Sequence, residues 1–393
     1  MTDGVVETNG AGDPVLATID RVVRDQSIVI CCGSGGVGKT TTAAAFALEA
    51  ARLGRRACVV TIDPARRLAN SLGLDALTNR PTLIEGPWPG ELHALMLDPK
   101  GTFDDLIQRY SDSPEQAEGI KVNRIYKNLT GTLSGTQEYM AMEKLYELVE
   151  EGGFDLVVVD TPPSRNALDF LDAPRRLTHF LENRLFQALM TPTRVGLRFM
   201  GVAAQALLRT IARVAGADIV RDAVTFFQAF EGMEEGFRTR AARVRELLVQ
   251  DGTSFVLVAS PRPDSVDEAV HFAGKLIESD MSVTALVVNR VQPRFAEDAQ
   301  LDRLRRLSGP EPDTVLGRLI DNLGGYTAAS DREELAFADL VAHVAPAPVY
   351  RVPLLNSDVH DLQGLGTIAD LLFTPAVATV PGTAADEGPS GER

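Results

Sequence analysis

The residues best suited to chemistry form a glycine-rich segment that follows an apolar run near the N-terminus. The spacing of Gly33, Gly38, Lys39 and Thr40 matches the pattern G-x-x-x-x-G-K-S/T of a phosphate-binding loop. Glycines let backbone N–H groups surround a phosphate, lysine supplies a mobile cation, and threonine supplies a hydroxyl ligand for Mg²⁺. The candidate nucleotide-binding residues of this loop are Gly33, Ser34, Gly35, Gly36, Val37, Gly38, Lys39, Thr40 and Thr41.

Two aspartates follow apolar runs and are candidates to act on a bound phosphate. Asp160 follows the run 155–159 and Asp63 follows the run 56–62. Because ligands collect at the carboxyl ends of parallel strands, we expect both carboxylates at one edge of a sheet. Asp160 and Thr40 are expected to hold Mg²⁺, and Asp63 to contact the metal or to orient and deprotonate the attacking water. For either aspartate alone, a strand-end turn or a helix cap is the simpler interpretation. The candidate catalytic residues are Lys39, Asp63 and Asp160.

The segments around these residues alternate between buried strands and helices. Helices are predicted from Lys39 to Leu53 and from Met140 to Glu151. Near-continuous apolar runs are typical of a parallel sheet covered on both faces. The sequence therefore predicts an α/β fold, a P-loop NTPase with a mainly parallel β-sheet flanked by helices. The predicted strands are residues 27–32, 56–62, 92–97, 155–159, 254–258, 283–288 and 349–352.

The alternation disappears between about residues 174 and 250, where apolar residues recur at helical spacing. We expect an α-helical insertion subdomain there, within a single P-loop NTPase domain of residues 15–373. The tails, residues 1–14 and 374–393, are predicted to be disordered. The apolar stripe of the insertion is either bundle core or a groove for a client helix. It includes Phe180, Leu185, Leu189, Met190, Phe199, Met200, Phe226 and Phe227.

The composition excludes several classes of function. A formal net charge of −15 argues against a protein whose main ligand is nucleic acid. No apolar run has the length of a membrane span and the N-terminus has no signal-peptide pattern, so a cytoplasmic location is expected. The three cysteines, Cys31, Cys32 and Cys58, fall in predicted buried strands and lack the spacing of a zinc site.

The motifs together resemble one ATPase family over nearly the whole predicted domain. The segments Gly33 to Thr41, Asp63 to Ala65 and Asp160 to Pro163 resemble, in order and spacing, the ATPases of arsenite pumps and of tail-anchored-protein targeting. The resemblance implies ATP as the nucleotide. It also implies that Asn289 hydrogen-bonds adenine and that the backbone near Pro353 and Leu354 lines the base pocket. Further similar segments are 90–99, 237–248, 287–290 and 352–355, with Val359 behind the last.

The sequence departs from the family pattern at two motifs. Ser34 stands where relatives have a lysine that reaches across a dimer to the phosphates of the partner, so hydrolysis is expected to be slow or to need a charge from a partner subunit. Arg66 and Arg67 are candidate substitutes, although a solvated basic pair is the simpler interpretation. Pro162 and Pro163 stiffen a segment that is more flexible in relatives.

These observations predict a Mg²⁺-dependent ATPase whose nucleotide state controls a dimer and a helical subdomain that binds clients. The partner is expected to be an identical chain or a homologous ATPase subunit, and the clients to be apolar helices of membrane proteins. Membrane association would then be peripheral and through partners. Two alternatives remain: an energy-coupling subunit of an anion transporter, for which the lack of paired cysteines argues against arsenite, and a weakly hydrolysing, nucleotide-dependent scaffold.

Overall fold

One eight-stranded sheet forms the centre of the computed structural model, in the order β3-β4-β2-β5-β1-β6-β7-β8. Neighbouring strands are parallel except β3, which pairs antiparallel with β4 at one edge. The strands are β1 (Ile28–Cys32), β2 (Arg56–Thr61), β3 (Thr82–Ile84), β4 (Glu91–Met96), β5 (Leu156–Asp160), β6 (Thr253–Ala259), β7 (Val283–Val291) and β8 (Val349–Pro353). The structure describes residues 14–63, 67–124, 126–127, 136–162, 222, 225–226, 229, 233–308 and 314–374.

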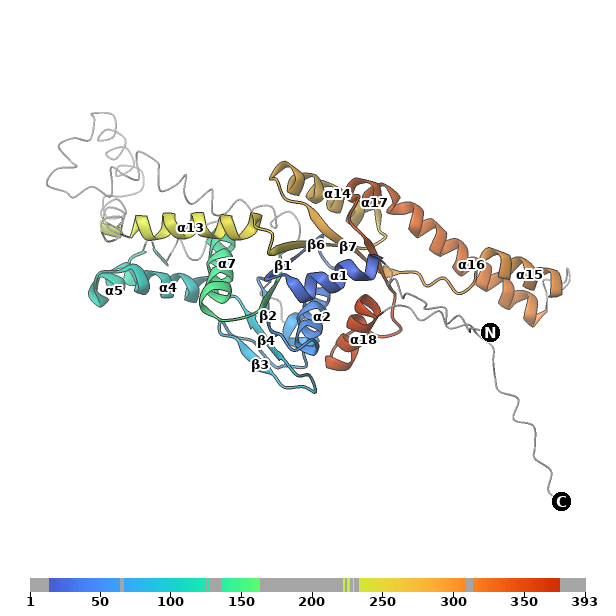
Figure 1. The fold of residues 1–393 in the computed structure, drawn as a ribbon, viewed down its shortest axis with the longest axis horizontal. Coiled ribbons are helices and arrows are strands. Elements are labelled where there is room, and N and C mark those ends of the chain that lie inside the picture. Colours follow the sequence, from blue (N-terminus) through green and yellow to red (C-terminus); the bar gives the residue numbers. More distant parts are fainter. Residues whose placement is uncertain are drawn as a thin grey trace, which may run out of the picture.

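Helices cover both faces of this sheet (Figure 1). On β1, Val29 and Cys31 join the core on one face, while Ile28, Ile30 and Cys32 join the core on the other. This alternation explains why the strand reads as a continuous apolar run. The first face is covered by α1 (Pro14–Asp25), α2 (Lys39–Arg52), α3 (Arg67–Ser71) and α18 (Leu362–Phe373), and the second by α7 (Thr136–Tyr146), α13 (Glu234–Val249), α14 (Pro263–Glu278) and α17 (Ala338–Val344).

Two groups of helices extend beyond the sheet at opposite ends of the molecule (Figure 1). At one end, α4 (Pro99–Tyr110) and α5 (Pro114–Val122) pack with α7 and α13 around a separate apolar cluster that contains Ile107, Tyr126 and Phe237. At the other end, α15 (Asp298–Ser308) and α16 (Val315–Ala336) form a long hairpin. In the part of the chain that the structure describes, no helix is long and apolar enough to cross a membrane.

The predicted fold class is confirmed, and most predicted strands agree with the structure to within one or two residues; β7 continues three residues further, to Val291. The sequence did not predict α1 or the three-residue strand β3. The helix predicted from Met140 to Glu151 begins earlier, at Thr136, and its last turn is a π-helix, η1 (Glu147–Glu151). All three cysteines are buried and unpaired, and burial raises the pKa of each thiol.

The predicted helical insertion is described only in part. Its last helix, α13, ends one residue before the predicted boundary at residue 250, and Phe226 is buried in the cluster beside α4 and α7. The rest of the predicted apolar stripe lies outside the described residues, as do residues 1–13, Pro163 and residues 375–393. The choice between bundle core and client groove therefore stays a prediction.

Candidate nucleotide-binding site

The glycine-rich loop between β1 and α2 adopts a backbone that requires glycine. Gly33, Gly36 and Gly38 have φ angles of 149°, 78° and 101°. A Cβ atom at Gly33 would lie 2.0 Å from the Val258 carbonyl oxygen, and one at Gly38 would lie 2.2 Å from Asn289 Nδ2. The loop therefore packs directly against β6 and β7, and α2 begins at Lys39 with its N-terminus at the loop. Backbone N–H groups at such a helix start favour an anionic ligand.

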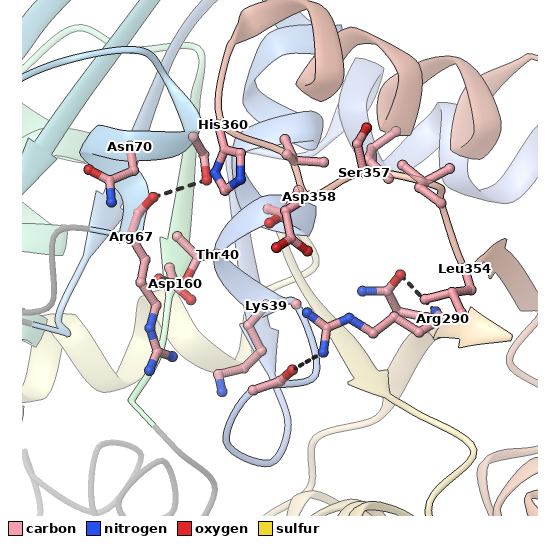
Figure 2. Close-up of a pocket in the computed structure, with 18 of the residues that line it drawn as sticks. Lys39, Thr40, Arg67, Asn70, Asp160, Arg290, Leu354, Ser357, Asp358 and His360 are labelled. Carbon is pink, nitrogen blue, oxygen red and sulfur yellow. Dashed lines mark hydrogen bonds between the residues drawn. The ribbon is translucent and has the colours of Figure 1, made fainter.

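A cavity of about 370 Å³ lies beside this loop (Figure 2). It contains predicted residues from both ends of the chain, because β1, β2, β5, β7 and β8 all end at the same edge of the sheet. Among the predicted residues, those that line it are Gly36, Gly38, Lys39, Thr40, Thr41, Asp63, Asp160, Asn289, Pro353 and Leu354.

Thr40 and Asp160 form a compact oxygen cluster next to Lys39. The register pairs Asp160 with both Cys31 and Thr61, which places its carboxylate beside the start of α2. Asp160 Oδ2 accepts hydrogen bonds from Thr40 Oγ1 at 2.7 Å and from Thr61 Oγ1 at 2.9 Å. Burial raises the pKa of Asp160 to about 6, although Thr40, Lys39 and Thr61 act in the opposite direction.

The other oxygen of this carboxylate, Asp160 Oδ1, is buried and has no hydrogen-bond partner among the described residues. An orphaned carboxylate oxygen is costly unless a cation or an ordered water completes it. Hydroxyl and carboxylate oxygens are the ligands that Mg²⁺ prefers. No group of three or more His, Cys, Asp or Glu side chains able to hold a metal occurs in the described segments. The donor set fits a magnesium ion whose remaining ligands are phosphate and water.

Lys39 closes the phosphate loop on itself. Its Nζ atom donates a hydrogen bond to the Ser34 carbonyl oxygen at 2.8 Å, and only 7% of the residue is exposed. Burial lowers the pKa of Lys39, against the attraction of Asp160. Asp63 lines the same cavity, and its Oδ2 atom is 3.8 Å from an Arg67 guanidinium nitrogen. Arg66, the other basic residue predicted here, lies outside the described residues.

Ser34 belongs to a different environment from Lys39. It is 5% exposed, and its hydroxyl donates to Ser265 Oγ at 3.0 Å, which in turn accepts the Ser260 N–H at 3.0 Å. Ser34, Gly35 and Val37 do not line the nucleotide cavity but a second cavity of about 430 Å³ on the far side of the loop. The position at which the family resemblance led us to expect a lysine is therefore part of a neutral, buried hydrogen-bond network.

The adenine side of the predicted site is built from β7 and β8. Asn289 Nδ2 donates to the Val37 carbonyl oxygen at 2.8 Å, and Asn289 Oδ1 accepts the Arg290 N–H at 2.9 Å. Pro353 and Leu354 line the cavity, and the Leu354 N–H is fixed by the Val291 carbonyl oxygen at 2.9 Å. In this structure the Asn289 amide thus holds the phosphate loop on one side and its own strand on the other.

The sequence reasoning missed several polar residues of the same cavity. Asp358 and His360, in the loop between β8 and α18, are exposed and line the cavity, and Arg290 lies beside the predicted Asn289 (Figure 2). The signal that could have found Asp358 and His360 is their place just after a strand that ends at the ligand edge. The further lining residues that were not predicted are Asn70, Ser71, Thr161, Leu355, Ser357 and Ile368.

Hydrogen bonds connect this cavity to the helices at the α13 end. Gln137 Nε2, at the start of α7, donates to the Ile62 carbonyl oxygen at 3.2 Å, one residue before Asp63. Further along α7, the buried Glu143 accepts a hydrogen bond from Arg240 of α13. Burial raises the pKa of Glu143, opposed by Arg240. These two side-chain hydrogen bonds therefore link the residue before Asp63 to α7, and α7 to α13.

Comparison with known proteins places these features in one family. A family profile described as "Anion-transporting ATPase" matches residues 26–308. The chain is 24% identical over 378 residues to "ATPase ASNA1 homolog" of Dictyostelium discoideum, covering 94% of this chain and 97% of that protein. It is 22% identical over 383 residues to "ATPase get3" of Aspergillus niger, covering 96% and 98%. It is also 22% identical over 373 residues to "ATPase GET3" of Chaetomium globosum, covering 93% and 96%. The chain belongs to the anion-transporting ATPase family and is an ATPase.

Proposed function

We propose that the chain hydrolyses ATP in a Mg²⁺-dependent reaction at the cavity between the phosphate loop and Asp160. The observation that carries this proposal is the cluster in which Thr40 and Thr61 share one oxygen of Asp160 while its other oxygen has no partner among the described residues. A hydroxyl and a strand-end carboxylate beside a glycine-rich loop are the usual ligands of a nucleotide-bound magnesium ion.

In the proposed reaction, Lys39 exchanges the Ser34 carbonyl oxygen for oxygens of the β- and γ-phosphates. Thr40 and Asp160 would hold Mg²⁺ when it is bound, and the ion would supply positive charge that offsets the charge of the phosphates. Asp63 orients the attacking water and accepts its proton. A bond forms between the water oxygen and the γ-phosphorus, and the bond to the β–γ bridging oxygen breaks, so the products are ADP and inorganic phosphate.

The base is proposed to bind between β7 and β8. Asn289 is positioned to hydrogen-bond adenine after its amide leaves the Val37 carbonyl oxygen, and Pro353 and Leu354 supply apolar contact. Leu354 is 52% exposed and lines the cavity, so its side chain is accessible to a flat ring.

We further propose that the ATPase is cytoplasmic, works as a dimer and delivers tail-anchored membrane proteins, with the helical insertion as the client-binding part. The support is the resemblance to targeting ATPases, together with relatives named ASNA1 and GET3 that match at least 93% of the chain. The bonds from Ile62 through Gln137 to α7, and from Glu143 to Arg240, provide a route from nucleotide to helices. Because Ser34 carries no charge, a homologous subunit that retains the lysine is a suitable partner.

The decisive test separates binding, assembly and delivery. Titration calorimetry of the full chain with a non-hydrolysable ATP analogue and Mg²⁺ should show uptake that Asp160→Asn weakens. Sedimentation should show a dimer with ATP, alone or with a co-expressed homologous subunit. In the presence of ATP, a synthetic membrane protein with one C-terminal apolar helix should crosslink to the chain, and it should be released after hydrolysis. Absence of nucleotide uptake overturns the proposal, and hydrolysis stimulated by an oxyanion but not by the client favours the transporter alternative.

A further inference from the structure

Arg290 occupies an irregular point of β7. In the pairing with β8, Asn289 is opposite Val352 and Val291 is opposite Pro353, so Arg290 is the extra residue of a β-bulge. Its φ angle is +62°, a left-handed conformation that non-glycine residues rarely adopt. Bulges and such backbone outliers cluster at functional sites, where they redirect a side chain.

The bulge turns the side chain of Arg290 back over the phosphate loop. Its Nη1 atom donates to the Gly36 carbonyl oxygen at 3.1 Å, a contact that joins residues 254 positions apart in the sequence. Figure 2 shows the guanidinium extending from β7 toward Lys39. Arg290 and Gly36 line both the nucleotide cavity and the second cavity beside Ser34, so this side chain lies at the boundary between the two.

The surroundings of the Arg290 guanidinium differ from those of other arginines near the two cavities. Arg262 is paired with Asp264 at 2.7 Å, and Arg67 lies 3.8 Å from Asp63. Within the described part of the chain, no carboxylate lies within ion-pair distance of the Arg290 guanidinium, and the Gly36 carbonyl is its hydrogen-bond acceptor. A planar guanidinium with N–H groups to spare, held at a phosphate loop, is suited to polyphosphate oxygens.

We propose that Arg290 is the second cation of the phosphate site and supplies the positive charge that Ser34 does not. The N–H groups of Arg290 that Gly36 does not use would bind oxygens of the β- and γ-phosphates, in the cavity that Arg290 and Lys39 both line. This inference rests on the proposed ATP site. It gives a role to the bulge and to the left-handed arginine, which lie beside a loop whose second residue is a neutral, buried serine.

Affinity measured along a series of nucleotides tests this proposal. Calorimetry with AMP, ADP and a non-hydrolysable ATP analogue should show that Arg290→Ala lowers the affinity for the ATP analogue about 10-fold to 50-fold. The affinity for ADP should fall less, and the affinity for AMP should not change measurably. Arg290→Lys should be intermediate. Equal losses for all three nucleotides would assign Arg290 to the base instead, and unchanged affinities would remove it from the site; either result overturns the proposal.

A further variant guards against a folding artefact. Arg290→Gly removes the side chain but suits a φ angle of +62°, so it should melt at the wild-type temperature or higher and still lose affinity for the ATP analogue. If the wild-type protein binds no nucleotide, the proposed function itself fails. That outcome differs from one in which the wild-type protein binds nucleotide and Arg290→Ala changes nothing, which overturns the Arg290 proposal alone.

Discussion

The two halves of the phosphate loop are held by different kinds of interaction. The second half, around Lys39 and Thr40, is bonded to the buried carboxylate of Asp160 and carries charge of its own. The first half, around Ser34 and Gly36, is neutral and is held by Ser265 and Arg290, which lie more than 200 residues away in the sequence. The chemistry of the second half therefore follows from the local motif, whereas that of the first half depends on contacts with residues far away in the sequence.

This difference predicts that mutations in the two halves of the loop will affect different properties of the protein. Losses at the second half should appear mainly in turnover and metal dependence, because its groups face the phosphates. Losses of the Ser34 and Ser265 hydroxyls should appear mainly in stability, because these two groups satisfy one another. Four measurements test the contrast.

Lys39→Ala should give the largest effect. Removal of a cation aimed at the transferred phosphoryl group is expected to lower turnover about 10²-fold to 10³-fold. Steady-state ATP hydrolysis measures this, with Lys100→Ala as the control, because Lys100 is exposed and pairs with Asp104 on α4. A Lys39→Ala rate within tenfold of wild type would contradict the role assigned to the second half.

Asp160→Asn should move stability and activity in opposite directions. The native pKa of about 6 exceeds the ordinary value, so without Mg²⁺ the wild type should lose stability as the pH rises from about 4 to 6, and the variant should not. At pH 7 the variant should be more stable by about 1–2 kcal/mol, since it buries no charge. Its Mg²⁺-dependent turnover should fall about 10²-fold.

Chemical denaturation at pH 5 and pH 7 measures the stability difference of that variant. Asp280→Asn is the matched control, because Asp280 is exposed, lies away from the cavity, and has a φ angle of +60° that asparagine tolerates. A less stable Asp160→Asn protein at pH 7 would mean that Lys39, Thr40 and Thr61 already compensate the buried carboxylate.

Gly38→Ala and Gly36→Ala form a matched pair within the loop. Both residues have positive φ angles, but an added Cβ at Gly38 meets Asn289 Nδ2 at 2.2 Å, while one at Gly36 meets no heavy atom within 4 Å. We expect a loss of about 3 kcal/mol of unfolding free energy for Gly38→Ala and about 1 kcal/mol for Gly36→Ala. Adding Asn289→Ala should remove most of the difference between the two variants. Equal losses for Gly38→Ala and Gly36→Ala in thermal denaturation would show that the Asn289 side chain moves aside without loss of stability.

The smallest effect is expected where the loop is neutral. A double-mutant cycle of Ser34→Ala and Ser265→Ala should give a coupling of about 1 kcal/mol in the free energy of unfolding, the value of one buried hydrogen bond. Turnover should fall far less than in Lys39→Ala. A coupling near zero would indicate that Ser265 is satisfied by the Ser260 N–H alone.

Much of this arrangement could be predicted from the sequence because its signals are local. The apolar runs of β1, β2 and β5 are continuous, since each strand is buried on both faces, and Asp63 and Asp160 follow them directly. Asn289 and the segment at Pro353 were predicted only through the family resemblance, because nothing in their neighbourhood distinguishes them from ordinary strand ends.

What escaped prediction depends on geometry that single residues do not reveal. Arg290 acquires its position from a bulge, and a bulge is set by the pairing between β7 and β8 rather than by composition. The pairing of Ser34 with Ser265 joins positions 231 residues apart. The edge strand β3 is too short to show an alternating pattern, and the π turn of η1 replaces what periodicity describes as ordinary helix.

The bond between Lys39 and the Ser34 carbonyl oxygen sets a threshold for what can enter the loop. A weakly charged anion that replaces the Ser34 carbonyl oxygen gains little, because Lys39 then only exchanges one oxygen acceptor for another. A polyphosphate brings several oxygens at once and also reaches the backbone amides beyond the lysine. At the proposed site, the bond between Lys39 and Ser34 would therefore favour ligands that present several oxygens at once.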